Sequence, residues 1–276
     1  MKKITSVLMA VIILAVSLLC ASCGEEKKTI TINSINDLNG LSIAFQTGTT
    51  ADGLIEELNK TGSVKTNNYS NEEMAACFTL LQNGEIDAVM CDSGVAELFV
   101  KNNPGKFSIA WTQTDEAEEF GIAIGKGDTK MKSAIDLAMA ELKADGFMDA
   151  LYDKWFGSGA EVTMPTAKSE TINADITLLN AGYLTVGCEI GYPPFEDYAE
   201  DGKTPIGYDI DLVKAIAIKL GLEVKVIDTA FDTILAGIGT NYDIVAAAVT
   251  IDADRAKQVD FSDPYIVNYQ TVVIAK

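Results

Sequence analysis

Residues 247–265 read AAVTIDADRAKQVDFSDPY and begin within an apolar run, Ile244–Val249. This run predicts a buried strand. The elements predicted before this strand alternate in type: a strand at 184–187, a helix at 210–220, a strand at 223–227 and a helix at 231–238. Such alternation indicates an α/β fold, in which largely parallel sheets carry helices on their faces.

The first half of the chain repeats the alternation. Strands are predicted at 41–45, 65–69, 86–90 and 107–111, and helices at 50–59, 70–82, 93–101, 130–143 and 147–156. Ser70 and Glu73 have the spacing of a capping box at the start of one of these helices. An aspartate stands directly ahead of an apolar strand in each half, at Asp87 and Asp243, and this weak echo favours two similar lobes.

Composition excludes several classes of function. The chain has 276 residues, 48% of them hydrophobic, which is enough for two modest domains with packed cores. Its net charge of −19 argues against nucleic-acid binding, because nothing would neutralise a run of phosphates. The absence of histidine removes the commonest general acid/base and metal ligand, so we expect no metal, no cofactor and no catalytic residues.

The N-terminus predicts export. Two lysines precede an apolar run, Val7–Leu19, that is too short to span a bilayer comfortably. The segment Cys20-Ala21-Ser22-Cys23-Gly24 then resembles a bacterial lipoprotein signal, although Cys20 stands where leucine is usual. We expect residues 1–22 to be removed, Cys23 to carry a lipid, and residues 23–34 to tether the protein to a membrane in the cell envelope. A plain secretory signal is the alternative.

Three cysteines remain beyond the signal: Cys77, Cys91 and Cys188. An odd count leaves at least one thiol free within a single chain, and the three form no CxxC pair that would indicate zinc. We expect them to be small buried residues, with a Cys77–Cys91 disulfide left open as an alternative.

The opening stretch, together with Gly207–Leu212 and the loop Tyr192–Glu196, resembles the first lobe of periplasmic solute-binding proteins of the polar amino-acid ABC-transporter family (family 3). A site for a free amino acid needs a guanidinium and backbone donors for the carboxylate, each charge-assisted bond contributing roughly 1.5–3 kcal/mol. The resemblance assigns Arg255 to that carboxylate, with Thr250 and the backbone of Ala248 beside it.

The early part of the chain resembles the second lobe of the same family. Its turn at Gln46–Thr50 opens a helix whose free N–H groups can donate to a carboxylate, which implies contacts from Thr49 and Thr50. The segment Val89–Ser93 matches the family motif whose aspartate binds the α-ammonium, so Asp92 takes that role. A helix N-cap is the competing role for Asp92.

The remaining contacts implied by the resemblance surround the side chain of the ligand. Tyr192, Phe195 and Phe231 would form an aromatic wall, with burial in the core as the ordinary alternative for each. Glu189 stands where relatives often have a polar or acidic group, and a solvated loop carboxylate is its alternative.

The resemblance runs in an unusual order, because the block that normally opens the family closes this chain. It implies two Venus-flytrap lobes in exchanged order, a circular permutation opened at one of the two inter-lobe crossings. The expected parts are a second lobe at 35–118, one remaining hinge crossing at 119–125, helices of the first lobe at 126–157, a linker at 158–180 and the main part of the first lobe at 181–276.

The implied function is binding of a polar or cationic amino acid for an ABC transporter permease, by a monomer that closes on a hinge. The alternatives are a cyclohexadienyl-dehydratase-like enzyme on the same fold, a ligand sensor or domain-swapped assembly protein, and a truncated tandem of two binding proteins.

Overall fold

The computed structural model describes residues 30–172 and 175–276, and Ile32–Lys276 form one compact unit. The predicted signal and Cys23 lie outside the described residues. The elements of the unit are η1 (Ile35–Leu38), β1 (Ser42–Gln46), α2 (Thr50–Thr61), β2 (Asn67–Asn71), α3 (Met74–Asn83), β3 (Ala88–Asp92), α4 (Ser93–Asn102), β4 (Phe107–Phe120), β5 (Ala123–Gly125), α5 (Thr129–Ala144), α6 (Phe147–Phe156), β6 (Tyr183–Cys188), β7 (Asp197–Tyr198), β8 (Pro205–Ile206), α7 (Tyr208–Leu220), β9 (Glu223–Asp228), η2 (Phe231–Gly237), β10 (Ile244–Val245), η3 (Arg255–Lys257), β11 (Val259–Phe261) and β12 (Ile266–Ala275).

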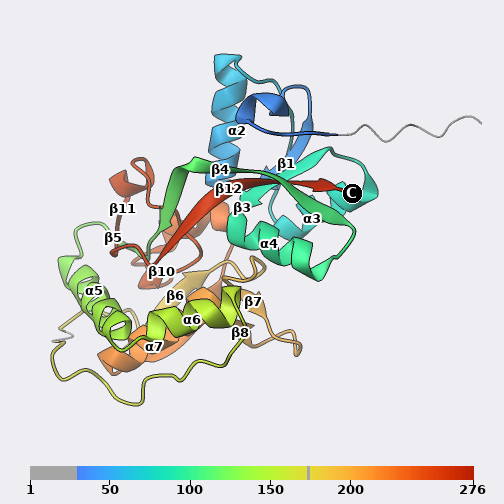
Figure 1. Ribbon diagram of the computed structural model, residues 1–276. Helices are drawn as coiled ribbons and strands as arrows, with labels where there is room; N and C mark the ends of the chain where they lie inside the picture. The colour runs from blue at the N-terminus through green and yellow to red at the C-terminus, as the bar shows by residue number, and fades with distance from the viewer. Residues whose placement is uncertain (1–29, 173–174) are drawn as a thin grey trace, which may run out of the picture. The chain divides into compact units, whose positions relative to one another are not determined.

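Two five-stranded sheets define two lobes (Figure 1). One has the order β2-β1-β3-β12-β4, and the other has the order β11-β5-β10-β6-β9. Each sheet joins three parallel strands to an antiparallel pair, so the sheets are mixed rather than mostly parallel. The antiparallel strands arise where the chain passes from one lobe to the other and must reverse direction.

The chain crosses between the lobes twice, which corrects the expectation of a single crossing. One passage leads from β4 into β5 and the other from β11 into β12. Strand β12 pairs with β3 and β4, as the red and green ribbons in Figure 1 show, and therefore belongs to the lobe formed by the early residues. The expected boundary at 181–276 fails because β12 finds its hydrogen-bonding partners in the other lobe.

Local signals explain most of the helix boundaries. In α2, the side chain of Thr49 accepts a hydrogen bond from the N–H of Asp52 at the N-cap, and Gly62 ends the helix in the left-handed conformation. The capping box expected at Ser70 is wrong, because Ser70 lies in β2 and α3 begins at Met74. There the backbone of Ser70 pairs with Phe45 of β1, so sheet pairing overrides the local capping signal.

The echo between Asp87 and Asp243 has a common structural basis. The Asp87 carboxylate accepts from the N–H of Ser42 at 2.8 Å, and the Asp243 carboxylate accepts from the N–H of Thr185 at 2.8 Å. Each aspartate thus ties its own strand to a neighbouring parallel strand, β1 in one lobe and β6 in the other.

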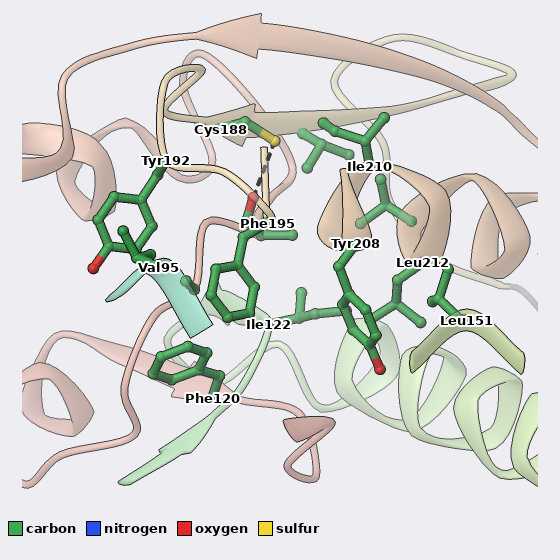
Figure 2. Close-up of a cluster of buried hydrophobic side chains, with 14 of the residues drawn as sticks. Val95, Phe120, Ile122, Leu151, Cys188, Tyr192, Phe195, Tyr208, Ile210 and Leu212 are labelled. Atoms are coloured by element: carbon green, nitrogen blue, oxygen red, sulfur yellow. Dashed lines mark hydrogen bonds between the residues drawn. The ribbon is translucent and has the colours of Figure 1, made fainter. Parts of the chain in front are cut away.

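A cluster of aromatic rings packs where the two lobes meet (Figure 2). Phe195 lies against Phe120 of the first crossing, with ring centroids 5.4 Å apart, and against Phe156 of α6 at the same distance. Gly94 of α4 packs so closely on Phe156 that an added Cβ would lie 2.7 Å from its ring. This apolar contact makes the lobes share a core at the base of the crossings.

The expected linker carries no helix or strand in its described residues between α6 and β6. It is nevertheless fixed to its lobe, since Ser169 donates its N–H to the carbonyl of Lys219 and Leu179 donates to Asp243. Across residues 30–172 and 175–276, no helix combines the length and apolar character that a membrane span requires. The three described cysteines are free and buried.

Candidate functional site

Ten side chains from both lobes line one cavity: Gln46, Thr49, Thr50, Asp92, Glu189, Tyr192, Phe231, Ala248, Thr250 and Arg255. Nine of them are residues that the sequence singled out for ligand contact. They come from strand ends, helix starts and loops of both sheets, so the cavity exists only when the two lobes approach each other.

Arg255 supplies the positive charge of the cavity. Its guanidinium donates to the carbonyl of Thr250 at 3.0 Å and to the carbonyl of Gly48 in the other lobe at 3.1 Å. It also pairs with Asp252 at 3.2 Å and lies over the ring of Phe231, 5.5 Å from its centroid. The Arg255 side chain is only 13% exposed, and these contacts fix its conformation.

Two threonines from different lobes meet on one carboxylate. Thr50 at the start of α2 and Thr250 after β10 both donate their hydroxyls to Glu118, at 3.0 and 2.9 Å. Thr49 caps α2, and its own hydroxyl donates to the carbonyl of Gln46 at 2.7 Å. The start of α2 and the Arg255 guanidinium line the same cavity, an arrangement suited to an anion.

Asp92 stands at the N-cap position of α4, but its side chain does not cap that helix. It accepts instead from Tyr192 at 2.5 Å, from Asn268 at 2.5 Å and from Gln270 at 2.9 Å. The capping role passes to Asn268, whose side-chain oxygen accepts from the N–H of Ser93 at 3.0 Å. The carboxyl group of Asp92 therefore does not cap the helix and lines the cavity instead.

Burial weakens the acidity of two carboxyl groups in the cavity. Desolvation raises the pKa of Asp92 to about 7, with Glu118 adding repulsion and three hydrogen bonds opposing the shift. Desolvation likewise raises the pKa of Glu189 to about 7, although Gln46 donates to it at 2.5 Å. A cation placed beside either carboxyl group would lower its pKa and favour its ionised form.

The backbone at Ala248 adopts an unusual conformation. Its φ of +47° is the one positive value among the described residues other than glycine. Its N–H donates to Asp209 at 2.7 Å, away from the cavity. The resemblance associates this position with small residues, and the left-handed backbone gives the physical reason.

Phe195 is the one expected site residue that the structure does not place at the cavity. Its side chain is 1% exposed and packs between the rings of Phe120 and Tyr208 (Figure 2). The ring of Phe156 also packs on it. Tyr192, three residues earlier, reaches the cavity because its hydroxyl needs the polar partner that Asp92 provides. For Phe195, burial in the core thus replaces the expected aromatic wall.

Four further polar residues surround the cavity and were not assigned to it from the sequence: Gln46, Glu118, Asn268 and Gln270. Asn268 and Gln270 stand two apart on β12, so both point to the same face of an otherwise largely apolar strand. This spacing of two polar residues in an apolar strand could have identified them from the sequence. In the described chain, no group of three or more potential metal-ligating side chains comes together.

Residues 32–158 and 184–276 match the bacterial extracellular solute-binding proteins, family 3. These two segments make up most of the chain, and it belongs to that family. The family comprises two-lobe, extracytoplasmic binding proteins, and two similar proteins of Escherichia coli carry the name ABC transporter arginine-binding protein, one of them as a putative one.

The L-glutamate/L-aspartate-binding protein of Pseudomonas aeruginosa is 29% identical over 133 residues, 48% of this chain and 44% of the relative. The L-cystine-binding protein TcyJ of Escherichia coli is 36% identical over 108 residues, 37% of this chain and 40% of the relative. This chain therefore spans less than half the length of these relatives. A solved ancestral arginine-binding protein bound to arginine is 48% identical, covering 31% of this chain and 38% of its own, with a TM-score of 0.30.

Proposed function

We propose that the chain binds one free amino acid in the cavity between its lobes and hands it to an ABC importer without chemical change. The arrangement that carries this proposal is a single guanidinium, Arg255, placed across the cavity from a buried carboxylate, Asp92. An α-carboxylate and an α-ammonium on one ligand match that separation of charge.

The carboxylate of the ligand would be held by Arg255 and by the hydroxyl of Thr250, with Ala248 lining the cavity beside them. The start of α2 adds the N–H group of Thr50 from the other lobe, with Thr49 beside it. A carboxylate in this position draws donors from both lobes and so favours the closed state over the open one.

The ammonium would lie at Asp92, and the ligand side chain would extend between Phe231 and Tyr192 toward Glu189. Three carboxylates, Asp92, Glu118 and Glu189, lie in or beside the cavity, whose lining contains one guanidinium. A zwitterion leaves this excess of negative charge in place, whereas an additional cation on the ligand side chain offsets it. The site charge therefore favours a cationic amino acid, of the arginine or lysine class, over an acidic one.

Isothermal titration of the purified protein with the twenty amino acids tests this assignment. Arginine or lysine should bind most tightly, neutral polar amino acids more weakly, and aspartate and glutamate not measurably. Tight binding of aspartate or glutamate would contradict the proposed ligand class. Failure of all twenty to bind would contradict the proposed function itself.

A second candidate is an enzyme that eliminates water from a cyclic prearomatic acid. The observation that favours it is the raised pKa of Glu189, about 7, which is suited to a general acid. Incubation with prephenate or arogenate, followed by detection of the aromatic product, distinguishes the two. Product formation that Glu189→Gln abolishes would replace the binding function with catalysis.

The exchanged order of the two blocks is also part of the proposal. A circular permutation whose opening lies between β12 and η1 accounts for both crossings, because both elements belong to the same lobe and no crossing is cut. A chain that runs 184–276 and then 32–158 through a short linker should fold and bind the same ligand with similar affinity. Loss of folding in that variant would contradict the permutation.

Two further features of the proposal concern location and assembly. Cys23 carries a lipid that anchors the protein to the membrane, and Cys23→Ser should release it into the soluble fraction and abolish labelling by a fatty-acid analogue.

One chain supplies every residue of the cavity, which supports a monomer that binds one ligand. Light scattering that finds a dimer with shared lobes would favour the domain-swapped alternative.

A further inference from the structure

Two buried carboxyl groups lie together and do not line the cavity. Glu196 ends the loop that follows Tyr192, and Asp209 lies in the first turn of α7. Neither side chain is exposed to solvent. Gly207 permits this proximity, because a Cβ there would come within 2.0 Å of the carbonyl oxygen of Phe195.

The two groups differ in the donors that reach them. One oxygen of Asp209 accepts from the N–H of Ala248 at 2.7 Å and from the hydroxyl of Tyr265 at 2.9 Å. Its other oxygen, and both oxygens of Glu196, have no donor among the described residues. Two buried carboxylates with three unpartnered oxygens would be very costly, whereas one shared proton supplies the missing hydrogen bond.

We infer that Glu196 and Asp209 share one proton as a carboxylic acid–carboxylate pair, and that this pair positions the backbone of Ala248 at the ligand cavity. Glu196 carries the proton and donates a hydrogen bond to Asp209. Asp209 is the ionised partner, because the N–H of Ala248 and the hydroxyl of Tyr265 stabilise its negative charge. The second part of this inference rests on the function proposed above.

The surroundings reinforce proton retention. Burial, followed by repulsion from Asp209, raises the pKa of Glu196 well above its ordinary value, and burial raises the pKa of Asp209 to about 7. The titratable groups that act on the pair from neighbouring elements are all acidic: Asp92, Cys188, Glu189, Tyr208 and Tyr265.

The pair connects three parts of the molecule that matter for closure. Asp209 holds Ala248, which lines the cavity and carries the left-handed φ of +47°. It also holds Tyr265, which lies in the second crossing between β11 and β12. Since the N–H of Ala248 points to Asp209 and not to the cavity, the pair sets which backbone groups remain for a ligand. Glu196 and Asp209 are thus positioning residues that do not touch the ligand.

Infrared spectroscopy of the carboxylic acid carbonyl band tests the shared proton directly. At pH 8, Asp92 and Glu189 are largely ionised, since their pKa values are about 7, so a residual band reports a more strongly held proton. We expect wild type to show this band and Glu196→Gln to lack it. The exposed control Glu200→Gln should retain it.

The conservative variants separate proton sharing from simple packing. The amide of Glu196→Gln still donates to Asp209, so its affinity for L-arginine should stay within about twofold of wild type, whereas Glu196→Ala should lose about tenfold. In Asp209→Asn the burial of Glu196 remains and the repulsion from Asp209 is lost, so Glu196 should keep its proton and the band should persist at a shifted frequency, because the acceptor of its hydrogen bond is an amide instead of a carboxylate. This second variant decides the question even where Glu196→Ala fails to fold.

The outcomes are distinguishable from those of the proposed function. Wild type that binds L-arginine but shows no band at pH 8, a band that survives in Glu196→Gln, or a band that Asp209→Asn leaves unshifted overturns the shared proton. An unchanged affinity in Glu196→Ala overturns the positioning role. If wild type binds none of the twenty amino acids, the proposed function fails, while the band still decides whether the pair holds a proton.

Discussion

Asp92 and Tyr192 stand 100 residues apart, belong to different lobes, and are joined by a hydrogen bond of 2.5 Å from the tyrosine hydroxyl to the carboxylate. This bond sits on the residue that we assign to the ligand ammonium. It therefore links closure of the lobes to the charge state of the site, since an ionised Asp92 accepts the hydroxyl more strongly than a neutral one.

Tyr192→Phe removes that donor while retaining the ring. The hydrogen bond lowers the pKa of Asp92, so its loss should raise that pKa further above 7 and shift the pH midpoint of arginine binding upward. The variant should also lose about 1–2 kcal/mol of unfolding free energy, because a charged group loses a donor. Denaturant titration and calorimetry across pH measure both effects. Tyr198→Phe, whose hydroxyl bonds to Asp228 at the surface, should change neither.

Binding of a cationic amino acid should strengthen as pH rises from 5 to 7 and then level off. In the empty site Asp92 and Glu189 have pKa values of about 7, and a bound cation favours their ionised forms, so binding releases protons. The affinity should fall by about tenfold per pH unit below 7 for each carboxylate. Calorimetry in two buffers with different ionisation enthalpies measures the protons released. An affinity that stays constant between pH 5.5 and 8 would contradict this coupling.

Arg255→Ala should weaken ligand binding at least about 100-fold. The substitution removes two charge-assisted hydrogen bonds to the carboxylate, each contributing about 1.5–3 kcal/mol. Lys257→Ala is the matched control, because Lys257 lies in the same short helix η3, is exposed and pairs with Asp254 at the surface. Titration calorimetry compares the two variants. Equal affinities would sink the assignment of the carboxylate position.

Ala248→Gly should stabilise the folded protein by up to about 1 kcal/mol. Glycine adopts a φ of +47° without the steric cost that alanine incurs, and the N–H that bonds to Asp209 remains. The neighbouring Ala247→Gly should destabilise the protein by a similar amount, since Ala247 is buried and has an ordinary φ. Thermal unfolding of both variants gives the comparison, and a lower melting temperature for Ala248→Gly would be the contrary result.

The empty protein should be more stable at pH 5 than at pH 8. Asp92, Glu189 and Asp209 have pKa values of about 7 when folded, well above those of unfolded carboxyl groups. The folded state therefore holds protons that the unfolded state releases, and its stability declines as pH rises from about 4 through 7. Melting temperatures across this range measure the trend. A rise in stability between pH 5 and 8 would show that these groups are ionised in the folded protein.

Much of the cavity could be predicted from short motifs. Arg255 and Thr250 belong to one continuous stretch, and Thr49, Thr50 and Asp92 lie at the junction of a strand and a helix, where the sequence marks the boundary. Hydrophobic periodicity placed α6 at Phe147–Phe156 and α4 at Ser93–Asn102 within a residue, because both helices bury one apolar face.

The sequence by itself determined the α/β class, the family and nine of the ten side chains that line the cavity, because these depend on local patterns and continuous motifs. Only the tertiary structure decided that β12 pairs with β3 and β4, that the chain keeps two crossings, and that Phe195 packs in the core. It also brought Glu118 to Thr50 and Thr250, and Glu196 to Asp209. Strand pairing and the burial of charge depend on residues far apart in the chain, and no local pattern encodes which of them meet.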